Sequence, residues 1–449
     1  MPSPIVDAVT AVLVYEGEIL LARRQPHLAA FPGYWAFPGG KVDRSDGDDP
    51  LPGTQFAAFP ARLIRALVRE IWEELGYDLV AAAELGDIAE IRALGVATSP
   101  AFVPARFNTH FFRIELRARP TLTHDANEIE QLHWRTPQLW LETYGHGELL
   151  LAPPTLATLR ASQIAESVTP DFDFAELNDP ARIPMMESVR GVRQLFVRSN
   201  TLPPADRTNC FLLGDDGEYR VLVDPSPCDA NECERLCLQA GALGFNEVFL
   251  THHHHDHRQY ANEIARRFGV PIGLSADTHT RIRASDPRYF DGIEVRLHHD
   301  GDVVTRWLGQ PLRVHAVPGH DEGQLALMPD SRAFCIVGDL IQGIGTVVIA
   351  PPEGDMSKYF ATLERVIALN PRVILPSHGG ALGGVFYLQQ ALKHRREREA
   401  QIVKLLAAGH AVNELLSTIY QNLDPRLIPL ARMNITSHLT KLRSEGAIA

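Results

Sequence analysis

A run of four histidines, an aspartate and a fifth histidine constrains this chain more than any other feature. The run is Thr251-His-His-His-His-Asp-His257, and it directly follows the short apolar stretch Val248–Leu250. A buried strand that ends in such a run places the polar side chains at one edge of a sheet. Neutral imidazole and carboxylate groups are the ligands that zinc uses at open catalytic sites, where water completes the coordination. The run therefore predicts a metal site at the end of a strand.

Three more apolar, strand-like stretches end in residues of the same kind. They are followed within three residues by His320, Asp339 and His378. The stretches are Val314–Val317, Phe334–Val337 and Val373–Leu375. Because four strand ends each deliver an imidazole or a carboxylate, we expect them to meet in one centre.

These residues together resemble the metallo-β-lactamase superfamily over roughly residues 190–385, which implies an αββα sandwich. The H-x-H-x-D-H motif of that family falls on the histidine run, and the resemblance implies two Zn2+ (or Fe) ions that activate water for hydrolysis. The implied ligands of one ion are His252, His254 and His320, and those of the other are Asp256, His257 and His378, with Asp339 between the two. Asp256 is also the implied catalytic residue, and Asp224 would support the ligand loop.

The two remaining histidines of the run, His253 and His255, occupy variable positions of the motif, so we expect both to point away from the metal ions. Within the superfamily, Gly319–Gly323 and Gly338–Thr346 resemble the lactamase-β-like branch. That branch includes glyoxalase-II-like hydrolases and some single-strand ribonucleases. No motif specifies a substrate.

A second group of acidic residues lies in one predicted helix, Ala61–Leu75. Its carboxylates Glu70, Glu73 and Glu74 stand at i, i+3 and i+4, so they project from one face. Carboxylates this close repel one another unless a divalent cation neutralises them, and hard oxygen ligands suit Mg2+ or Mn2+. Arg69 can reach Glu73 one turn away. The opposite face is apolar and would anchor the helix on a sheet through Leu63, Ile64, Leu67, Val68, Ile71 and Leu75.

The stretch Arg69–Tyr77 resembles the Nudix box at every fixed position, and Phe37–Gly40 resembles the glycine loop of that family. The resemblance implies an α/β/α fold. It also implies an enzyme that cleaves a nucleoside diphosphate linked to another group, with coenzyme A diphosphates as one candidate substrate. The implied catalytic and metal-binding residues are Glu70, Glu73 and Glu74. A solvated acidic helix face is the alternative interpretation.

Two departures from the Nudix pattern concern the glycine loop. Asp46 stands where the family has a glutamate, so its carboxylate is one methylene short. The family's seven residues before Arg69 are replaced by the 22 residues Gly47–Val68. Both departures put the geometry of the loop in question.

The last segment, from Leu388, has helical periodicity and excess positive charge. Residues 388–449 contain nine lysines and arginines against five acidic residues, within a chain of net charge −12. The stretch Asn434–Ile448 resembles the third helix and wing of a winged helix, which implies contact with RNA or DNA. A helical cap that packs on the hydrolase domain or joins subunits is an equally good interpretation.

The composition is that of a globular protein, with 45% hydrophobic and 22% charged residues. No apolar run approaches the ~20 residues that span a bilayer, so we expect no membrane association. The N-terminus has no cationic region before its apolar stretch, which favours a cytoplasmic location. The five cysteines would then be free thiols.

The sequence therefore predicts a multidomain protein of α/β and α+β class. The expected parts are a Nudix domain at 1–160, a linker at 161–187, a metallo-β-lactamase-fold domain at 188–385 and a small α-helical winged-helix-like domain at 386–449. The expected function is a bifunctional hydrolase of small molecules. One site would cleave nucleoside-diphosphate derivatives, and the other would cleave an ester, a thioester or a phosphodiester.

Two other functions remain as alternatives. The first is a single-strand RNA endonuclease with an accessory Nudix domain, which predicts salt-sensitive binding to single strands. The second is a ligand-sensing, DNA-binding regulator. Complete ligand sets at both centres count against a regulator, because a sensor has no need of water-activating residues.

Overall fold

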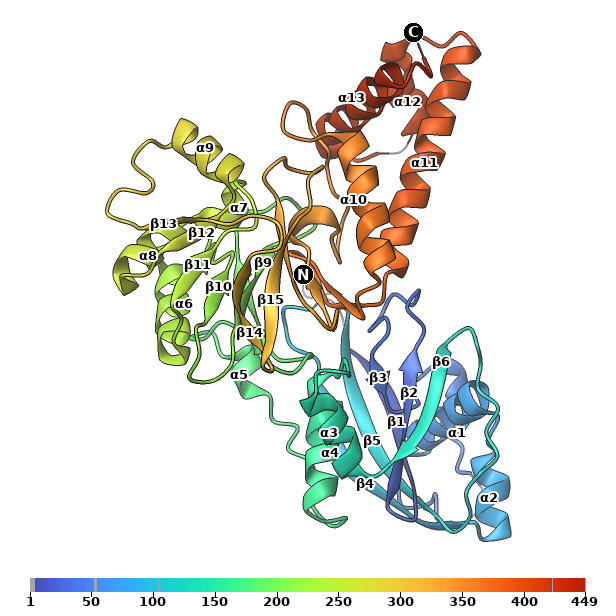
Figure 1. Cartoon of the computed structure of the whole chain (residues 1–449). Helices are drawn as coiled ribbons and strands as arrows, with labels where there is room; N and C mark the ends of the chain where they lie inside the picture. Colours follow the sequence, from blue (N-terminus) through green and yellow to red (C-terminus); the bar gives the residue numbers. More distant parts are fainter. Residues whose placement is uncertain (1–4, 52–54, 104, 422, 449) are drawn as a thin grey trace. The chain divides into compact units, whose positions relative to one another are not determined.

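The computed structural model of the chain describes residues 5–51, 55–103, 105–421 and 423–448. They form two compact units, which are drawn in sequence colours in Figure 1. The first unit contains the residues up to Pro180 together with Met186–Arg190, and the second contains Ala181–Met185 and the chain from Gly191 onward. The segment between the units thus contributes five residues to each in turn.

A six-stranded mixed sheet forms the centre of the first unit. Its strands are β1 (Ile5–Tyr15), β2 (Glu18–Arg24), β3 (Trp35–Ala36), β4 (Ile88–Thr98), β5 (Arg106–Leu116) and β6 (Ile129–Arg135). The order is β3-β2-β1-β5-β4, and β6 also pairs with β2. Strand β1 runs parallel to β5 over its full length and antiparallel to β2.

Helices cover both faces of this sheet. Alternate residues of a strand face opposite sides, and in β1 both sides are apolar. Val9 and Leu13 pack against α1 (Ala61–Leu75), whereas Val12 and Val14 pack against α3 (Pro137–Gly145) and α4 (Pro153–Ile164). Helix α2 (Leu79–Leu85) follows α1. The unit has the expected α/β/α layers, and α1 has the bounds predicted from its periodicity.

The second unit contains two sheets. One has the order β13-β12-β11-β10-β9-β8-β7, and the other has the order β14-β15-β16-β17-β18-β19. The strands of the first are β7 (Met185–Met186), β8 (Arg193–Arg198), β9 (Arg207–Leu213), β10 (Val221–Val223), β11 (Glu247–Phe249), β12 (Ile272–Leu274) and β13 (Val295–Leu297). Those of the second are β14 (Val303–Trp307), β15 (Gln310–Ala316), β16 (Leu325–Pro329), β17 (Cys335–Ile336), β18 (Val373–Leu375) and β19 (Leu382–Gly383).

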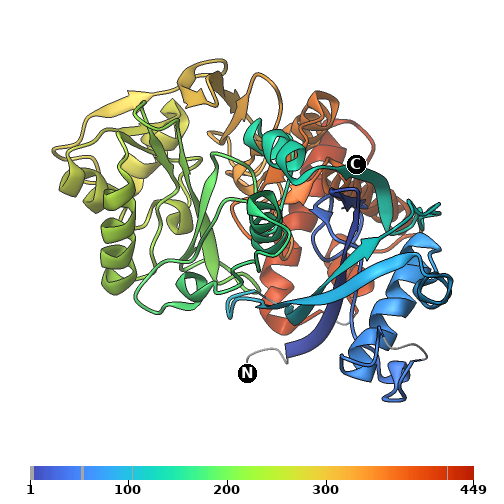
Figure 2. The same cartoon turned by 90° about the horizontal axis from the view of Figure 1, so that it is seen from below.

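Helices lie on the outer faces of these two sheets (Figures 1 and 2). Cys210 and Leu212 of β9 pack with α6 (Ala230–Leu243) and α8 (Ala261–Phe268), while Phe211 and Leu213 on the other face are equally buried. The second sheet packs against α10 (Met356–Leu369) and α11 (Phe386–Ala407). Burial on both faces of the sheets gives the αββα sandwich that was expected.

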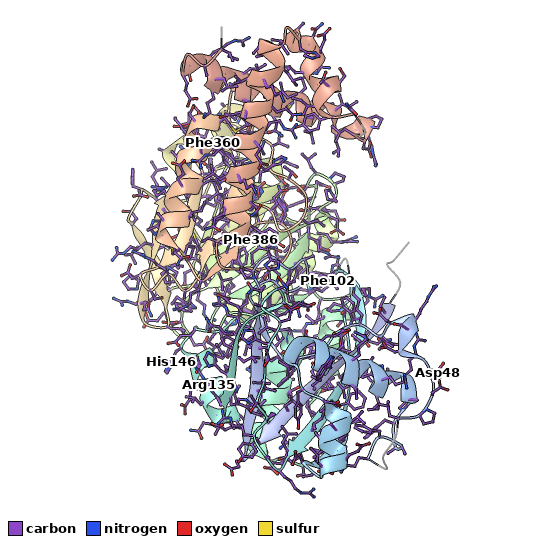
Figure 3. The ribbon with its side chains drawn as sticks, turned by 90° about the vertical axis from the view of Figure 1, so that its right-hand side faces the viewer. Asp48, Phe102, Arg135, His146, Phe360 and Phe386 are labelled. Carbon is purple, nitrogen blue, oxygen red and sulfur yellow. The ribbon has the colours of Figure 1, made fainter. Side chains whose placement is uncertain are left out.

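The C-terminal helices have a small core of their own. Ile402 of α11, Leu415 of α12 (Leu415–Ile419) and Ile435 of α13 (Ile428–Ser444) pack together in it. Helix α13 also contacts α10, where the side chain of Phe360 (labelled in Figure 3) lies under the ammonium of Lys441. Residues 445–446 form a turn and 447–448 are irregular, so the described part of the segment supplies the helices of the expected winged helix and no strand of a wing.

Candidate active sites

The sandwich brings all seven predicted metal ligands together at the ends of its strands. The histidine run follows β11 and continues into the short helix α7 (His255–Arg258). His320 follows β15, His378 follows β18, and Asp339 lies in the 3-10 helix η2 (Gly338–Leu340) after β17. All four strand ends therefore point to one centre, although β11 belongs to a different sheet from the other three.

Three ring nitrogens converge in the first group of ligands. Nδ1 of His254 lies 3.0 Å from Nε2 of His252 and 3.0 Å from Nε2 of His320. All three atoms lie within 4.8 Å of one another. Three nitrogens arranged around one point in this way fit a single cation.

The second group consists of Asp256, His257 and His378, and Asp339 lies between the groups. Nε2 of His378 is 3.5 Å from Oδ2 of Asp256 and 3.4 Å from Oδ1 of Asp339. The other oxygen of Asp339, Oδ2, lies 3.8 Å from Nε2 of His320 in the first group. Nε2 of His257 and Oδ1 of Asp339 are buried without a hydrogen-bond partner. Such atoms are rare in proteins, and here they fit a bound cation.

The outward nitrogen of every histidine in the two groups contacts an oxygen of a residue outside the two groups. His252 lies 3.0 Å from Oγ1 of Thr251, and His257 lies 2.9 Å from Oδ2 of Asp224. The other contacts are from His254 to Glu353 (3.2 Å), from His320 to the Val348 carbonyl (2.8 Å) and from His378 to the Arg207 carbonyl (2.8 Å). Such outer partners fix the ring orientation and tautomer of metal-binding histidines.

Burial and neighbouring charges act differently on the two groups. Burial and the adjacent imidazoles lower the pKa of His252 well below its usual value and that of His320 to about 4. Burial alone would also lower the pKa of His257, but the carboxylates of Asp256, Asp339 and Asp224 raise it well above the usual value. His252 and His320 are therefore neutral and ready to accept a cation, whereas a cation that binds beside His257 would displace a proton.

Asp224 holds the histidine run in the way expected of it. It follows β10 in a left-handed conformation, with φ of 47°, which aspartate tolerates better than most residues. Its Oδ1 accepts the Thr251 N–H at 2.8 Å, and its Oδ2 accepts the Thr251 hydroxyl at 2.6 Å as well as the His257 N–H. One buried carboxylate therefore fixes the start and the end of the run.

The variable histidines of the run differ from each other. His255 is exposed, whereas the side chain of His253 is only 13% exposed. Its Nδ1 lies 2.5 Å from Oδ2 of Asp321, and its Nε2 lies 3.4 Å from Oε1 of Glu353. Glu353 thus reaches both His253 and His254, and the hydrogen bond from His254 lowers the pKa of Glu353 to about 2. Glu353 could not be recognised from the sequence, because it lies in an irregular Pro-Pro-Glu-Gly stretch.

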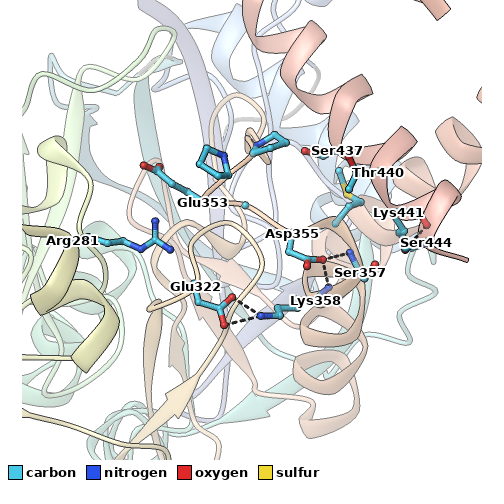
Figure 4. Close-up of a pocket in the computed structure, with 14 residues that line it drawn as sticks. Arg281, Glu322, Glu353, Asp355, Ser357, Lys358, Ser437, Thr440, Lys441 and Ser444 are labelled. Atoms are coloured by element: carbon cyan, nitrogen blue, oxygen red, sulfur yellow. Dashed lines mark hydrogen bonds and ion pairs between the residues drawn. The ribbon is translucent and has the colours of Figure 1, made fainter. Parts of the chain in front are cut away.

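A pocket of about 510 Å3 lies beside Glu353, between the loop that carries this residue and helix α13 (Figure 4). Its wall includes Ser437, Thr440, Lys441 and Ser444 of α13. Three cationic side chains and three carboxylates face it, namely Arg281, Lys358, Lys441, Glu322, Glu353 and Asp355. Lys358 is paired with Glu322 at 2.7 Å, so the pocket is polar without a net excess of either charge.

In the first unit, Arg69 holds the acidic face of α1. Its guanidinium lies 2.8 Å from Glu70 and 2.9 Å from Glu73, as the helical spacing predicted for the second of these. Glu74 is buried and accepts the Gly39 N–H at 2.9 Å, and burial raises its pKa to about 8. Among the described residues, the three carboxylates do not form a group as tight as those of the histidine centre. Their role as metal ligands stays a prediction.

The shortened carboxylate Asp46 still reaches its partner. Its Oδ1 accepts a hydrogen bond from Nε of Arg69 at 2.8 Å, and its Oδ2 accepts the Asp43 N–H at 2.6 Å. Arg69 also donates to the Lys41 carbonyl at 2.9 Å. The loop before the extended segment Gly47–Val68 is therefore hydrogen-bonded to α1, and the aspartate at position 46 does not disrupt this contact.

The cysteines are free thiols, four of them buried, as expected. No helix in the described ranges has the length and apolar character needed to cross a membrane.

Family models match three separate parts of the chain. The "NUDIX domain" matches residues 4–149, the "Metallo-beta-lactamase superfamily" matches residues 203–378, and the "Beta-lactamase associated winged helix domain" matches residues 411–449. These matches agree with the three resemblances found in the sequence.

Two relatives and a solved structure resemble part of the chain. A "Beta-lactamase-like protein 2 homolog" of Drosophila melanogaster is 28% identical over 253 residues, which are 54% of this chain and 84% of that protein. A "Hydroxyacylglutathione hydrolase" of Fuscovulum blasticum is 28% identical over 194 residues, 43% of this chain and 70% of that protein. A "Beta-lactamase domain protein" from Burkholderia ambifaria shares the fold, with a TM-score of 0.52 and 23% identity over 62% of this chain and 92% of that chain. The chain is thus a hydrolase that joins a Nudix domain to a metallo-β-lactamase superfamily domain and its associated winged helix.

Proposed function

We propose that the chain is a bifunctional hydrolase in which the histidine centre cleaves a thioester and the Nudix site cleaves a nucleoside diphosphate derivative. The convergence of five imidazoles, each with its outward nitrogen already bonded, is the observation that carries the first half. The name of the Fuscovulum blasticum relative specifies an acylated glutathione, which is a thioester, as its substrate. That likeness supports a thioester over the other bonds that such a centre can cleave.

The ligand set favours two zinc or iron ions in the histidine centre. His252, His254 and His320 would hold one, Asp256, His257 and His378 the other, and Asp339 would contact both. The ions would supply Lewis acidity and lower the pKa of a water molecule. Asp256 keeps 20% of its side chain exposed. Its carboxylate can therefore accept a hydrogen bond from the attacking water and orient it.

The acidic face of α1 would act on a diphosphate in the same general way. Glu70, Glu73 and Glu74 would hold Mg2+ or Mn2+, which suit carboxylate ligands and bind phosphate oxygens. The burial of Glu74 supports this assignment. Burial raises the pKa of its carboxyl group, and a cation bound beside it would favour the ionised form again. Arg69 keeps the carboxylates of Glu70 and Glu73 in position.

Each site can serve as the control for the other. We would assay the purified chain on acyl-thioesters of glutathione and pantetheine and on nucleoside diphosphate derivatives, with a single-stranded RNA as a third substrate. Asp256→Ala should abolish thioester cleavage and spare diphosphate cleavage, and Glu73→Gln should do the reverse. Full activity of both variants on every substrate would refute the two assignments. Cleavage of the RNA without thioester cleavage would favour a nuclease.

A further inference from the structure

One loop carries the outer partners of two histidines in the first group. Residues 342–355 connect η2 to α10 and form this loop, called here the outer loop. The Val348 carbonyl accepts the N–H of His320 at 2.8 Å, and Glu353 accepts that of His254 at 3.2 Å. The position of the outer loop therefore determines how both rings are oriented.

The C-terminal helices hold the outer loop on both sides of Val348. Arg395 of α11 donates to the Val347 carbonyl at 2.5 Å. Asn434 of α13 accepts the Ile349 N–H at 2.9 Å, and Ser437 of α13 donates to the Ile349 carbonyl at 2.6 Å.

The three side chains form a connected, buried network. Arg395, Asn434 and Ser437 are 5%, 8% and 3% exposed, and Arg395 also donates to Oδ1 of Asn434 at 3.0 Å. Buried polar groups that are fully paired rigidify the segments they join. Val348 thus lies between Val347, which is hydrogen-bonded to α11, and Ile349, which is hydrogen-bonded to α13.

The second group of ligands has its outer partners elsewhere. His257 is bonded to Asp224, after β10, and His378 to the Arg207 carbonyl, in β9. Neither partner belongs to the outer loop.

We infer that the C-terminal helices complete the outer coordination shell of one metal position, formed by His252, His254 and His320, and leave the other position unaffected. This inference rests on the proposed metal centre. Asn434 and Ser437 are then positioning residues that act through Val348. Asn434 and Ser437 of α13 are both bonded to the outer loop, so this part of the helix belongs to the surroundings of the site.

The test measures Zn2+ affinity in two backgrounds that each keep one group of ligands. His378→Ala retains the first group, and His320→Ala retains the second. Asn434→Ala and Ser437→Ala are added to each, and binding is measured by competition with a chromophoric chelator. Changing an outer partner of a ligand lowers metal affinity about 10–100-fold, so we expect a loss near 10-fold in the first background and none in the second.

Three further comparisons make the result specific. Thr436→Ala changes an exposed position of the same helix and should leave both affinities unchanged. Asn434→Asp keeps an acceptor for the Ile349 N–H and should restore binding. The Co2+ absorption spectrum of the first background should shift in Asn434→Ala, which a change in global stability alone would not cause.

Equal losses in the two backgrounds, or no loss in the first, would overturn the inference. Ser437→Ala removes a single hydrogen bond and supplies the same test if Asn434→Ala does not fold. A wild-type chain that binds no Zn2+ would instead contradict the proposed metal centre, so the two failures are distinguishable.

Discussion

Nδ1 of His257 lies 2.9 Å from Oδ2 of Asp224, and both side chains are almost completely buried. The same carboxylate accepts the N–H and the hydroxyl of Thr251, which starts the histidine run. Asp224 therefore orients a predicted ligand of the second group and at the same time fixes the backbone from which the first group begins. A single charge supports both groups.

Asp224→Asn should weaken metal binding at the second group more than at the first. The amide loses the negative charge that favours the outward N–H of His257, and changes of such partners typically cost 10–100-fold in metal affinity. Competition titration with Zn2+ should show one site weakened by about 10-fold or more. Asp330→Asn, at an exposed pair with Arg313, is the matched control and should change neither site. Undiminished affinity in Asp224→Asn would show that the contact does not orient His257.

Two neighbouring glycines of the Nudix loop should respond differently to alanine. In Gly39→Ala the new Cβ would lie 2.2 Å from the Val9 carbonyl oxygen, at a φ of 143°. Backbone strain of this kind costs about 1–3 kcal/mol, and each kcal/mol lowers the melting temperature by roughly 2–4 °C in a domain of this size. We expect a clear drop in the thermal transition of the first unit.

In Gly40→Ala the new Cβ would instead lie 2.4 Å from the carboxylate of Glu70. A flexible side chain can move, so the fold should survive, but the predicted metal ligand would be displaced. Misplacing a catalytic group by about 1 Å can cost 100-fold in rate. We therefore expect loss of diphosphate cleavage with little change in melting temperature and with thioester cleavage intact. Normal diphosphate cleavage would argue against Glu70 as a catalytic residue.

Arg69→Lys should impair the Nudix site although it keeps the charge. The guanidinium donates at once to Asp46, Glu70, Glu73 and the Lys41 carbonyl, and an ammonium cannot reproduce that forked geometry. We expect a higher Mg2+ concentration for half-maximal activity and a loss of stability of about 1–3 kcal/mol. Arg62→Lys, on the exposed side of the same helix, is the control. An unchanged Mg2+ dependence would contradict the positioning role of Arg69.

The parts of the fold with regular periodicity could be predicted from the sequence. The bounds of α1 follow from its apolar spacing, and the strands before His252, His320, Asp339 and His378 follow from short apolar runs that end in polar residues. In these segments the local pattern and the tertiary environment favour the same structure. The seven predicted ligands could be proposed from the sequence because each follows such a strand within a short stretch of polar residues.

The outer partners could not be predicted in this way. Val348 and Glu353 lie in an irregular loop, and one of them contributes only a backbone carbonyl, which carries no sequence signal. Val348 is followed by Ile349, whose N–H and carbonyl are bonded to side chains of α13, more than 80 residues away along the chain. From the sequence, the C-terminal segment could be either a nucleic-acid-binding module or a helical cap on the hydrolase domain. The burial of Asn434 and Ser437 supports the cap.

Glu74 should make the metal-free first unit less stable as the pH rises. Burial raises the pKa of Glu74 to about 8 in the folded chain, whereas a glutamate in an unfolded chain has a pKa of about 4.3. Below pH 4 both states hold the proton. Between pH 4 and 8 the unfolded chain releases it and the folded chain retains it, so stability falls across this range and levels off above pH 8.

Glu74→Gln should remove that pH dependence while keeping an acceptor for the Gly39 N–H. In EDTA we expect the variant to melt at the same temperature as the wild type near pH 4.5 and a few degrees higher at pH 8. With Mg2+ the wild type should have the higher melting temperature, because only its Glu74 carboxylate can be stabilised by the cation. Differential scanning calorimetry of the full chain measures both effects, with Glu84→Gln, at an exposed position of α2, as the control. A difference that stays constant from pH 4.5 to 8 would show that Glu74 ionises normally in the folded chain.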